Sequence, residues 1–206
     1  VSTLRLEKIR NRLSPHFIFN VLNQEVVNRK EEEKQELVSL VKLMRRNLEL
    51  AEQLCVTLAE ELDFVKTYID LERRSLGATF HPVIEIAGDV LPESVWLPSM
   101  MIQIPVENSV KHALRGKEGK RNLWIAADRR EGGVCIRITD NGGGYHPESR
   151  NRGTGTGMKV IMQTIQILNM KNQAAIDISV HNVTLPSGET GCEVTFLLPD
   201  KYDYRI

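Results

Sequence analysis

The sequence predicts an α+β protein, with a helical hairpin or bundle first and an α/β sandwich after it. Up to Gly77 the apolar residues recur at helical spacing, and beyond it they alternate with a period of two. Two turn signals, Glu131-Gly132-Gly133 and Pro186-Ser187-Gly188, separate alternating segments and predict hairpins. The second part is therefore expected to hold a mixed, mostly antiparallel sheet covered by helices on one face.

Length and composition exclude several classes of protein. The 206 residues suffice for two modest cores, and basic and acidic residues are equal in number, 27 each. This balance gives no reason to expect nucleic acid as a direct partner. No apolar run approaches the roughly 20 residues of a membrane span, so we expect this fragment to be soluble. The pattern of free cysteines and the lack of a signal peptide predict a cytoplasmic fragment. Because a helical pattern begins at once at Val1, we expect the fragment to come from a longer protein.

Three amphipathic helices are expected in the first part. Apolar stripes mark the first two, at about residues 3–29 and 37–48. Thr57-Leu58-Ala59-Glu60 is a capping box that starts the third, which ends near Gly77. Such stripes must pack against each other or against a second copy of the chain.

Pro15 interrupts the first of these helices. A proline inside a helix costs about 3 kcal/mol or more, and a local rule broken beside a titratable side chain points to function. His16 is that side chain, expected at the margin of the apolar stripe and in reach of solvent, and Asn20 follows one turn later on the same side.

The second part alternates strands and helices. We expect strands at about 83–86, 123–127, 134–139, 176–180 and 193–198, and helices at about 99–114 and 157–169. Cys55, Cys135 and Cys192 are odd in number and lie in apolar segments, which predicts buried free thiols.

The glycine-rich stretch from Asp140 to Met158 is the candidate site. A glycine inside a helix or strand costs roughly 0.5–1 kcal/mol relative to alanine, so this stretch is a loop whose backbone must approach something closely. Its second glycine cluster opens onto an apolar periodic helix, and a helix N-terminus suits an anion such as phosphate. The P-loop pattern G-x-x-x-x-G-K-[ST] is not present; a long surface loop is the alternative interpretation.

The helix expected at 99–114 carries the second candidate group. Asn108, Lys111 and His112 are spaced i, i+3, i+4 and so share one helix face, with Glu107 beside them. Asn108 can supply a neutral oxygen to Mg²⁺, which prefers oxygen ligands together with substrate phosphates. An ordinary polar helix face is the alternative for this helix alone.

In this order and separation, the motifs resemble the nucleotide site of the GHKL superfamily, whose fold is the Bergerat-type sandwich. Glu107-Asn108 then corresponds to the N box, Asp140–Gly144 to the G1 box and Gly153–Gly157 to the G2 box. The resemblance implies ATP as ligand, with Asp140 accepting a hydrogen bond from the adenine amino group. It implies that Gly142 and Gly144 let the backbone approach the base. It also implies a phosphate-binding group made of the residues Lys111, His112, Gly153, Gly155 and Gly157, the glycines lying in a lid.

Residues 13–23, L-S-P-H-F-I-F-N-V-L-N, resemble the phosphoacceptor helix of LytS-like sensor histidine kinases, and residues 57–74 resemble the second dimerisation helix of that family. The resemblance implies transfer of the γ-phosphoryl group of ATP to His16 with Mg²⁺, and then to an aspartate on a response regulator, of the kind with a LytTR-type output. It also implies a homodimer through the N-terminal helices, in a full-length protein anchored in the cytoplasmic membrane. Residues 1–76 would form the dimerisation and phosphotransfer domain and residues 77–206 the ATP-binding domain, with a hinge at about 76–78.

The sequence departs from the family pattern at a few positions. Phe17 follows the phosphoacceptor where many histidine kinases have an acid, so no base is assigned; Asn20 is a candidate to orient the ring and Glu107 to relay a proton. Ala113 stands where the family often has glycine, and Val160 where it often has asparagine. These departures keep two alternatives open. One is a nucleotide-binding pseudokinase that acts as a dimerisation module. The other is a GHKL ATPase in which Glu107 activates water, which leaves Pro15-His16-Phe17 unexplained.

Overall fold

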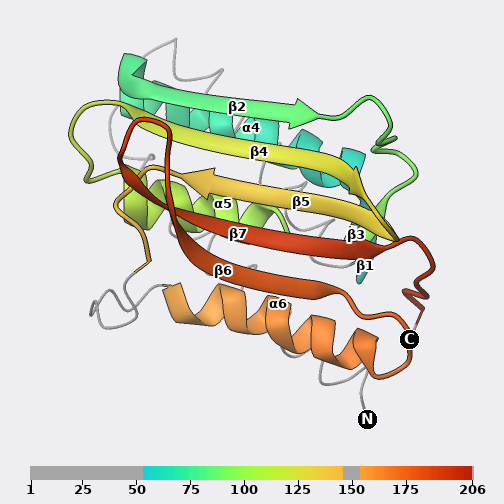
Figure 1. Cartoon of the computed structure of the whole chain (residues 1–206). Helices are drawn as coiled ribbons and strands as arrows, with labels where there is room; N and C mark the ends of the chain where they lie inside the picture. The colour runs from blue at the N-terminus through green and yellow to red at the C-terminus, as the bar shows by residue number, and fades with distance from the viewer. Residues whose placement is uncertain (1–52, 146–153, 206) are drawn as a thin grey trace, which may run out of the picture.

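The computed structural model describes residues 53–145 and 154–205, and Figure 1 shows how their elements are arranged. The centre is a five-stranded sheet with the order β2-β4-β5-β7-β6. Its strands are β2 (Phe80–Ile86), β4 (Arg121–Arg130), β5 (Gly133–Asp140), β6 (Asp177–Thr184) and β7 (Thr190–Pro199). β2 runs parallel to β4, and the other pairings are antiparallel. The predicted mixed, mostly antiparallel sheet is confirmed.

Both predicted hairpins are present, and each has a glycine at the position that needs it. Gly132, between β4 and β5, has φ 81°, and Gly188, between β6 and β7, has φ 83°. Residues other than glycine rarely adopt this left-handed backbone conformation. The turn signals in the sequence therefore set the register of these strand pairs.

The helices lie on one face of the sheet (Figure 1). They are α4 (Leu58–Leu76), α5 (Gln103–Asn108) with the π-helix η2 (Ser109–Leu114), and α6 (Thr154–Asn169); the short 3₁₀ helix η1 (Gly77–Thr79) joins α4 to β2. One core fills the space between this layer and the sheet, and its members include Phe64 of α4, Ile125 of β4, Ile136 of β5 and Ile165 of α6. The predicted α/β sandwich is confirmed.

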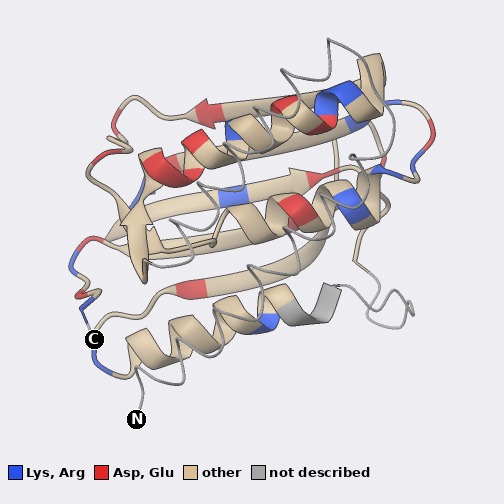
Figure 2. Cartoon of the chain, turned by 180° about the vertical axis from the view of Figure 1, so that it is seen from behind, with Lys and Arg blue, Asp and Glu red and all other residues tan. Residues whose placement is uncertain are grey.

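The predicted capping box begins α4. The Glu60 N–H donates to Thr57 Oγ1 at 3.3 Å, and the Thr57 N–H donates to Glu60 Oε2 at 2.9 Å. Acidic residues Glu60 and Glu61 lie in the first turn, and basic residues Arg73 and Arg74 lie in the last, as Figure 2 shows along this helix. Both ends therefore carry the charge that complements the helix dipole.

The predicted apolar stripe of α4 is buried, but it packs against the core beneath the sheet, which was not predicted. Leu58, Leu62, Val65 and Ile69 are each at most 4 % exposed and belong to the core that the sheet also lines. The sequence predicted packing against other N-terminal helices or a second copy of the chain. The boundary between residues 76 and 77 stays a prediction, although α4 on its N-terminal side packs with the sheet.

A small two-stranded sheet was not predicted. β1 (Cys55–Thr57) pairs antiparallel with β3 (Trp96–Pro98), with Val56 opposite Leu97. Three residues are too few to display an alternating pattern, so no sequence signal marks these strands. This pairing places the start of α4 beside the segment that leads into α5.

Some predictions lie outside the described residues, among them the first two helices with His16 and Asn20. In the described part, no helix has the length and apolarity needed to cross a membrane. Cys55, Cys135 and Cys192 form no disulfide, as predicted. The expected burial is complete only for Cys135, because the other two are partly exposed.

Candidate functional site

The N box lies on a helix that changes geometry in its middle. Gln103–Asn108 form the α-helix, and Ser109–Leu114 continue it as a π-helix, in which the Arg115 N–H donates to the Val110 carbonyl at 3.0 Å. A helix was predicted over about residues 99–114. The observed helix begins later, at Gln103, and its second half has π-helical instead of α-helical hydrogen bonds. π-Helical turns are rare and occur frequently at functional sites.

Glu107 is a nearly buried carboxylate at the end of α5. Its side chain is 13 % exposed, and Lys111 Nζ lies 3.5 Å from Oε2. Its Oε1 accepts a hydrogen bond from Gln103 Nε2 at 2.8 Å. Burial raises the pKa of Glu107, and the contacts with Lys111 and Gln103 oppose the rise. A carboxyl group whose pKa is raised in this way is a candidate for proton transfer.

Asn108, Lys111 and His112 differ in their surroundings. Asn108 is half-buried, and its carboxamide makes no hydrogen bond within residues 53–145 and 154–205. Lys111 and His112 are exposed on the π-helix. Burial, and next the charge of Lys111, lower the pKa of His112, so its imidazole is neutral at pH 7. The spacing i, i+3, i+4 defines one face only in an α-helix, so the predicted common face does not follow here.

Asp140 ends β5, and its carboxylate is held on both oxygens. Oδ2 accepts a hydrogen bond from Ser109 Oγ at 2.7 Å, and Oδ1 accepts one from the Gly142 N–H at 2.9 Å. The residue is 3 % exposed. Burial raises its pKa, and these hydrogen bonds oppose the rise. A carboxylate offers about four lone pairs, so this fixed group can still accept a hydrogen bond from a ligand.

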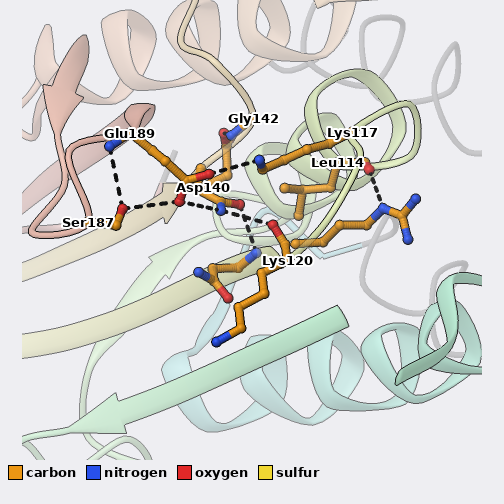
Figure 3. Close-up of polar contacts among 10 residues, drawn as sticks. Leu114, Lys117, Lys120, Asp140, Gly142, Ser187 and Glu189 are labelled. Carbon is orange, nitrogen blue, oxygen red and sulfur yellow. Dashed lines mark hydrogen bonds and ion pairs between the residues drawn. The ribbon is translucent and has the colours of Figure 1, made fainter. Parts of the chain in front are cut away.

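Asn141, the next residue, connects the end of β5 to neighbouring segments through hydrogen bonds of its side chain. Its Oδ1 accepts the Asn122 N–H at 2.8 Å, and its Nδ2 donates to the Lys120 carbonyl at 3.0 Å and to Glu189 Oε2 at 3.1 Å. Glu189 also pairs with Lys117 at 2.9 Å. Figure 3 shows Glu189 and Lys117 gathered around Asp140. The G1 box is thus tied to β4, to the segment after the π-helix and to the β6–β7 hairpin.

The G1 glycines lie where a side chain would collide. A Cβ on Gly142 would be 2.3 Å from the Ala113 Cβ, and a Cβ on Gly144 would be 2.8 Å from Asn182 Oδ1. Gly144 also has φ 90°. Asn182 in turn donates its Nδ2 to the Tyr145 carbonyl at 3.2 Å. The π-helix and β6 therefore both require small residues in the G1 box.

Gly142→Ala is expected to lower the free energy of unfolding by about 1–3 kcal/mol, the usual range for overpacking. Adding Ala113→Gly to the same chain should restore part of this stability, because it removes the Ala113 Cβ, the nearest clashing atom. The recovery is partial because the Ala113 Cα and C, at 2.8 Å from the added Cβ, remain. Urea unfolding of both single variants and the double variant measures this coupling. Gly116→Ala is the matched control, because no atom lies within 4 Å of its added Cβ. Strictly additive effects would contradict the contact.

The G2 box is described in part. Gly153 lies outside the described residues, and Gly155 falls in the first turn of α6. A Cβ on Gly157 would meet Ile104 Cγ2 at 2.7 Å, so this glycine brings α6 close to α5. Among the predicted site residues, the structure thus brings together Asp140, Gly142 and the helix that carries the N box. The roles of all of them stay predictions.

Sequence reasoning missed several residues that build the site. Ser109, Asn182, Glu189 and Glu61 carry hydrogen bonds to it or to its helix, and Gly191 is required because a Cβ there would lie 2.0 Å from the Asp140 carbonyl oxygen. Ser109 is one residue after the N box, so its place could have signalled a link to the site. The others lie far from the motifs along the chain, and no local pattern marks them.

The donor set fits an adenine nucleotide with a divalent ion. Asp140 offers a buried acceptor, and Asn108 offers an amide oxygen that has no hydrogen bond in the described part of the chain. In that same part no three His, Cys, Asp or Glu side chains gather as a metal site. A divalent ion would therefore need ligand oxygens from the nucleotide phosphates as well.

Two protein families match successive parts of this chain. The family described as histidine kinase matches residues 4–80, and the family described as histidine kinase-, DNA gyrase B-, and HSP90-like ATPase matches residues 98–202. Sensor protein LytS of Enterococcus faecalis is 28 % identical over 75 % of this chain and 28 % of its own length. Sensor protein LytS of Bacillus subtilis is 28 % identical over 94 % of this chain and 33 % of its own length. The chain thus spans about a third of the length of these relatives.

A solved structure shows the same fold. The histidine kinase domain of the blue-light activated histidine kinase of Erythrobacter litoralis superposes with a TM-score of 0.51 at 12 % identity, over 95 % of this chain and 93 % of that one. At this identity the likeness concerns the fold alone.

The mostly antiparallel sheet with helices on one face, and the Asp140 strand end against the N-box helix, define a GHKL-type nucleotide-binding protein. The chain belongs to the histidine kinase-, DNA gyrase B-, and HSP90-like ATPase family, its first part matches the histidine kinase family, and it is similar to the LytS sensor proteins.

Proposed function

We propose that this chain is the kinase core of a two-component sensor, which transfers the γ-phosphoryl group of ATP to His16 and then to an aspartate of a response regulator. The observation that carries the proposal is the buried Asp140 carboxylate, fixed by Ser109 and Gly142 beside the helix of Glu107 and Asn108. An acceptor held in this way selects an amino group on a ligand, as adenine has and guanine lacks at the corresponding position.

Each site residue has a proposed part in binding. Asp140 accepts the adenine amino group, and Gly142 and Gly144 keep the backbone beside the base free of side chains. Lys111, His112 and the glycines Gly153, Gly155 and Gly157 surround the phosphates. Asn108 is the protein ligand of Mg²⁺, which neutralises charge on the phosphates when it is bound.

The proposed chemistry is an in-line displacement at the γ-phosphorus. The unprotonated nitrogen of the His16 ring forms a bond to phosphorus, the bond from phosphorus to the bridging oxygen breaks, and ADP leaves with the electron pair. Neutral imidazole, with a pKa near about 6.5, needs no strong activation for this role. Asn20 orients the ring, and Glu107, whose pKa burial raises, accepts the ring proton that is then released. In the second step the regulator aspartate displaces the ring from phosphorus, and the ring regains a proton.

The wider organisation is also a proposal. Residues 1–76 form a dimerisation and phosphotransfer domain, residues 77–206 form the ATP-binding domain, and the chain is a homodimer through its N-terminal helices. The partner is a receiver domain, of a regulator with LytTR-type output. The full-length protein is anchored in the cytoplasmic membrane with this core in the cytoplasm, and nucleic acid is not a direct partner.

The test is incubation of the purified chain with γ-labelled ATP and Mg²⁺, followed by acid and base treatment of the labelled protein. Phosphohistidine is labile in acid and stable in base, so the expected label disappears in acid and survives base. A parallel sample with a chelator should stay unlabelled. Measured ATP binding without any label would contradict the kinase proposal and favour the pseudokinase, and release of free phosphate without label would favour a hydrolytic ATPase.

A further inference from the structure

Glu61 is a fully buried carboxylate for which the proposed chemistry has no use. It lies in the first turn of α4 and is 0 % exposed. Its Oε2 accepts the N–H groups of Ile102 at 3.1 Å and Gln103 at 3.2 Å, and its Oε1 accepts the N–H of Met100. Among the described residues, no lysine, arginine or histidine forms an ion pair with it. Backbone N–H groups alone therefore stabilise this carboxylate.

These N–H groups belong to the start of the N-box helix. The first N–H groups of a helix have no partner inside it and need one from elsewhere. The N-cap residue of α5, Ile102, has no side chain able to serve, and no side-chain cap is made. Glu61 takes this place from a different helix, about forty residues away along the chain. The start of α5 is thus set by the position of α4.

The backbone of Met100 shows how strongly this junction is held. Met100 has φ 70°, a left-handed conformation that is unfavourable for any residue with a Cβ. Its N–H is one of those that Glu61 accepts, and its side chain is 6 % exposed. Strained backbone of this kind persists only where surrounding contacts hold it.

A second contact ties α4 to the far end of the same helix. Glu72 Oε2 lies 2.6 Å from Arg115 Nη2, just after the π-helix, and Arg121 donates both to the Leu76 carbonyl at 3.3 Å and to the Leu114 carbonyl at 2.9 Å. Because α4 contacts α5 at its start and the segment after the π-helix at its end, α4 lies alongside the whole N-box helix as a support. The predicted hinge at 76–78 is bridged by the same Arg121, whose Nη1 also donates to Thr79 Oγ1 at 2.6 Å.

We propose that Glu61 is a positioning residue for the nucleotide site: it fixes the N-terminus of α5, and with it Glu107 and Asn108, to α4. Glu107 and Asn108 end this six-residue helix, so a shift of its start moves them directly. The inference rests on the proposed function and deepens it, because it makes the placement of α4 a determinant of ATP affinity. If α4 is fixed to the ATP site in this way, motion relative to the phosphoacceptor takes place on the N-terminal side of α4, and the domain boundary lies there instead of between residues 76 and 77.

The test compares Glu61→Gln with Leu62→Ala. Glutamine keeps the shape but turns an N–H₂ group toward backbone N–H donors. Leu62, 4 % exposed and next in α4, is matched in burial, but it belongs to the apolar core and has no polar group to accept the α5 N–H groups. ATP dissociation constants come from calorimetry, melting temperatures from thermal unfolding, and the exchange rates of the Met100, Ile102 and Gln103 amides from hydrogen exchange.

Glu61→Gln is expected to raise the ATP dissociation constant roughly tenfold, the equivalent of one charge-assisted hydrogen bond, and to speed exchange of the three amides. Leu62→Ala is expected to lower the melting temperature without changing ATP affinity. A Glu61→Gln chain that exchanges faster yet binds ATP as the parent does would overturn the inference alone. An affinity loss shared equally by Leu62→Ala would overturn it too. A parent chain that does not bind ATP would overturn the proposed function together with the inference.

A pH series gives a readout that loss of stability alone would not move. Burial raises the pKa of Glu61 to about 7, against the pull of the three N–H groups, and Glu107 is the charged group that adds to the rise. The parent carboxyl is therefore protonated at low pH and loses acceptor capacity, which glutamine lacks at every pH. The ratio of the variant and parent dissociation constants should fall as pH is lowered from about 8 to about 6, across the raised pKa. The titration of ATP itself is common to both chains and cancels in the ratio. A ratio that is constant with pH would overturn the role of the Glu61 charge.

Discussion

Asp140→Asn is expected to weaken ATP binding by roughly a hundredfold. A single amide oxygen replaces the two carboxylate oxygens that accept from Ser109, Gly142 and the ligand amino group, so one of these donors loses its acceptor and the charge-assisted hydrogen bond to the ligand is removed. Leaving one buried donor without a partner and losing such a bond together cost about 3 kcal/mol. Calorimetric titration of both chains with ATP measures the loss.

Asp128→Asn is the matched control for this variant. Asp128 lies on the neighbouring strand β4 and pairs with Arg130 at 2.8 Å and Arg137 at 3.4 Å. Because this pairing lies away from the proposed site, its ATP affinity should equal that of the parent. Equal affinity of the parent and Asp140→Asn would remove Asp140 from nucleotide recognition. A loss in the control as large as in Asp140→Asn would show that any change of charge on the sheet weakens binding.

His16→Gln is expected to abolish the acid-labile label completely. Glutamine has no nucleophilic nitrogen, because its amide lone pair is delocalised, so no phosphoryl group can be accepted at this position. ATP affinity should stay at the parent value, since the proposed nucleotide site uses residues from the second half of the chain. Scintillation counting after base treatment, with ATP binding measured on the same preparation, checks both statements.

His81→Gln serves as the control in that experiment. His81 is exposed on β2 and has no proposed part in transfer. It should carry the label as the parent does. Base-stable label remaining on His16→Gln would assign the phosphoacceptor to another residue. Loss of ATP binding in His16→Gln would show that the first part of the chain contributes to the nucleotide site.

The sheet could be predicted because its signals are local. Leu123, Ile125 and Ala127 are buried and alternate with half-exposed neighbours along β4, and glycines mark both hairpin turns. The parallel pairing of β2 with β4 joins segments far apart in the chain, and nothing in either segment specifies it. Alternation predicts a strand and its buried face, whereas the partner depends on the whole fold.

The start and the second half of the N-box helix could not be predicted from the local sequence. Its composition predicts a helix, but its start is capped by Glu61 of another helix, and its second half is a π-helix, which the apolar spacing does not distinguish from an α-helix. A cap supplied from about forty residues away leaves no pattern near residue 103. The same holds for α4, whose stripe was predicted correctly while its partner, the core of the sheet, was not.

The candidate site was predicted through its glycines and its order of motifs, because both lie within short stretches of chain. What the glycines contact was not predicted: Gly142 faces Ala113, and Gly157 faces Ile104. The supporting network of Asn141, Glu189 and Lys117 joins three separate loops and strands, so it exists only in the folded chain.

The measurement that tests the central proposal most directly is the location of the phosphoryl group on the parent chain. The protein is incubated with ATP and Mg²⁺, digested at alkaline pH to preserve phosphohistidine, and analysed by mass spectrometry. We expect the added phosphoryl group on the peptide that contains His16, and none on peptides with His81, His112, His146 or His181. A phosphoryl group on one of those histidines, or an acid-stable phosphate on a serine or threonine, would contradict it.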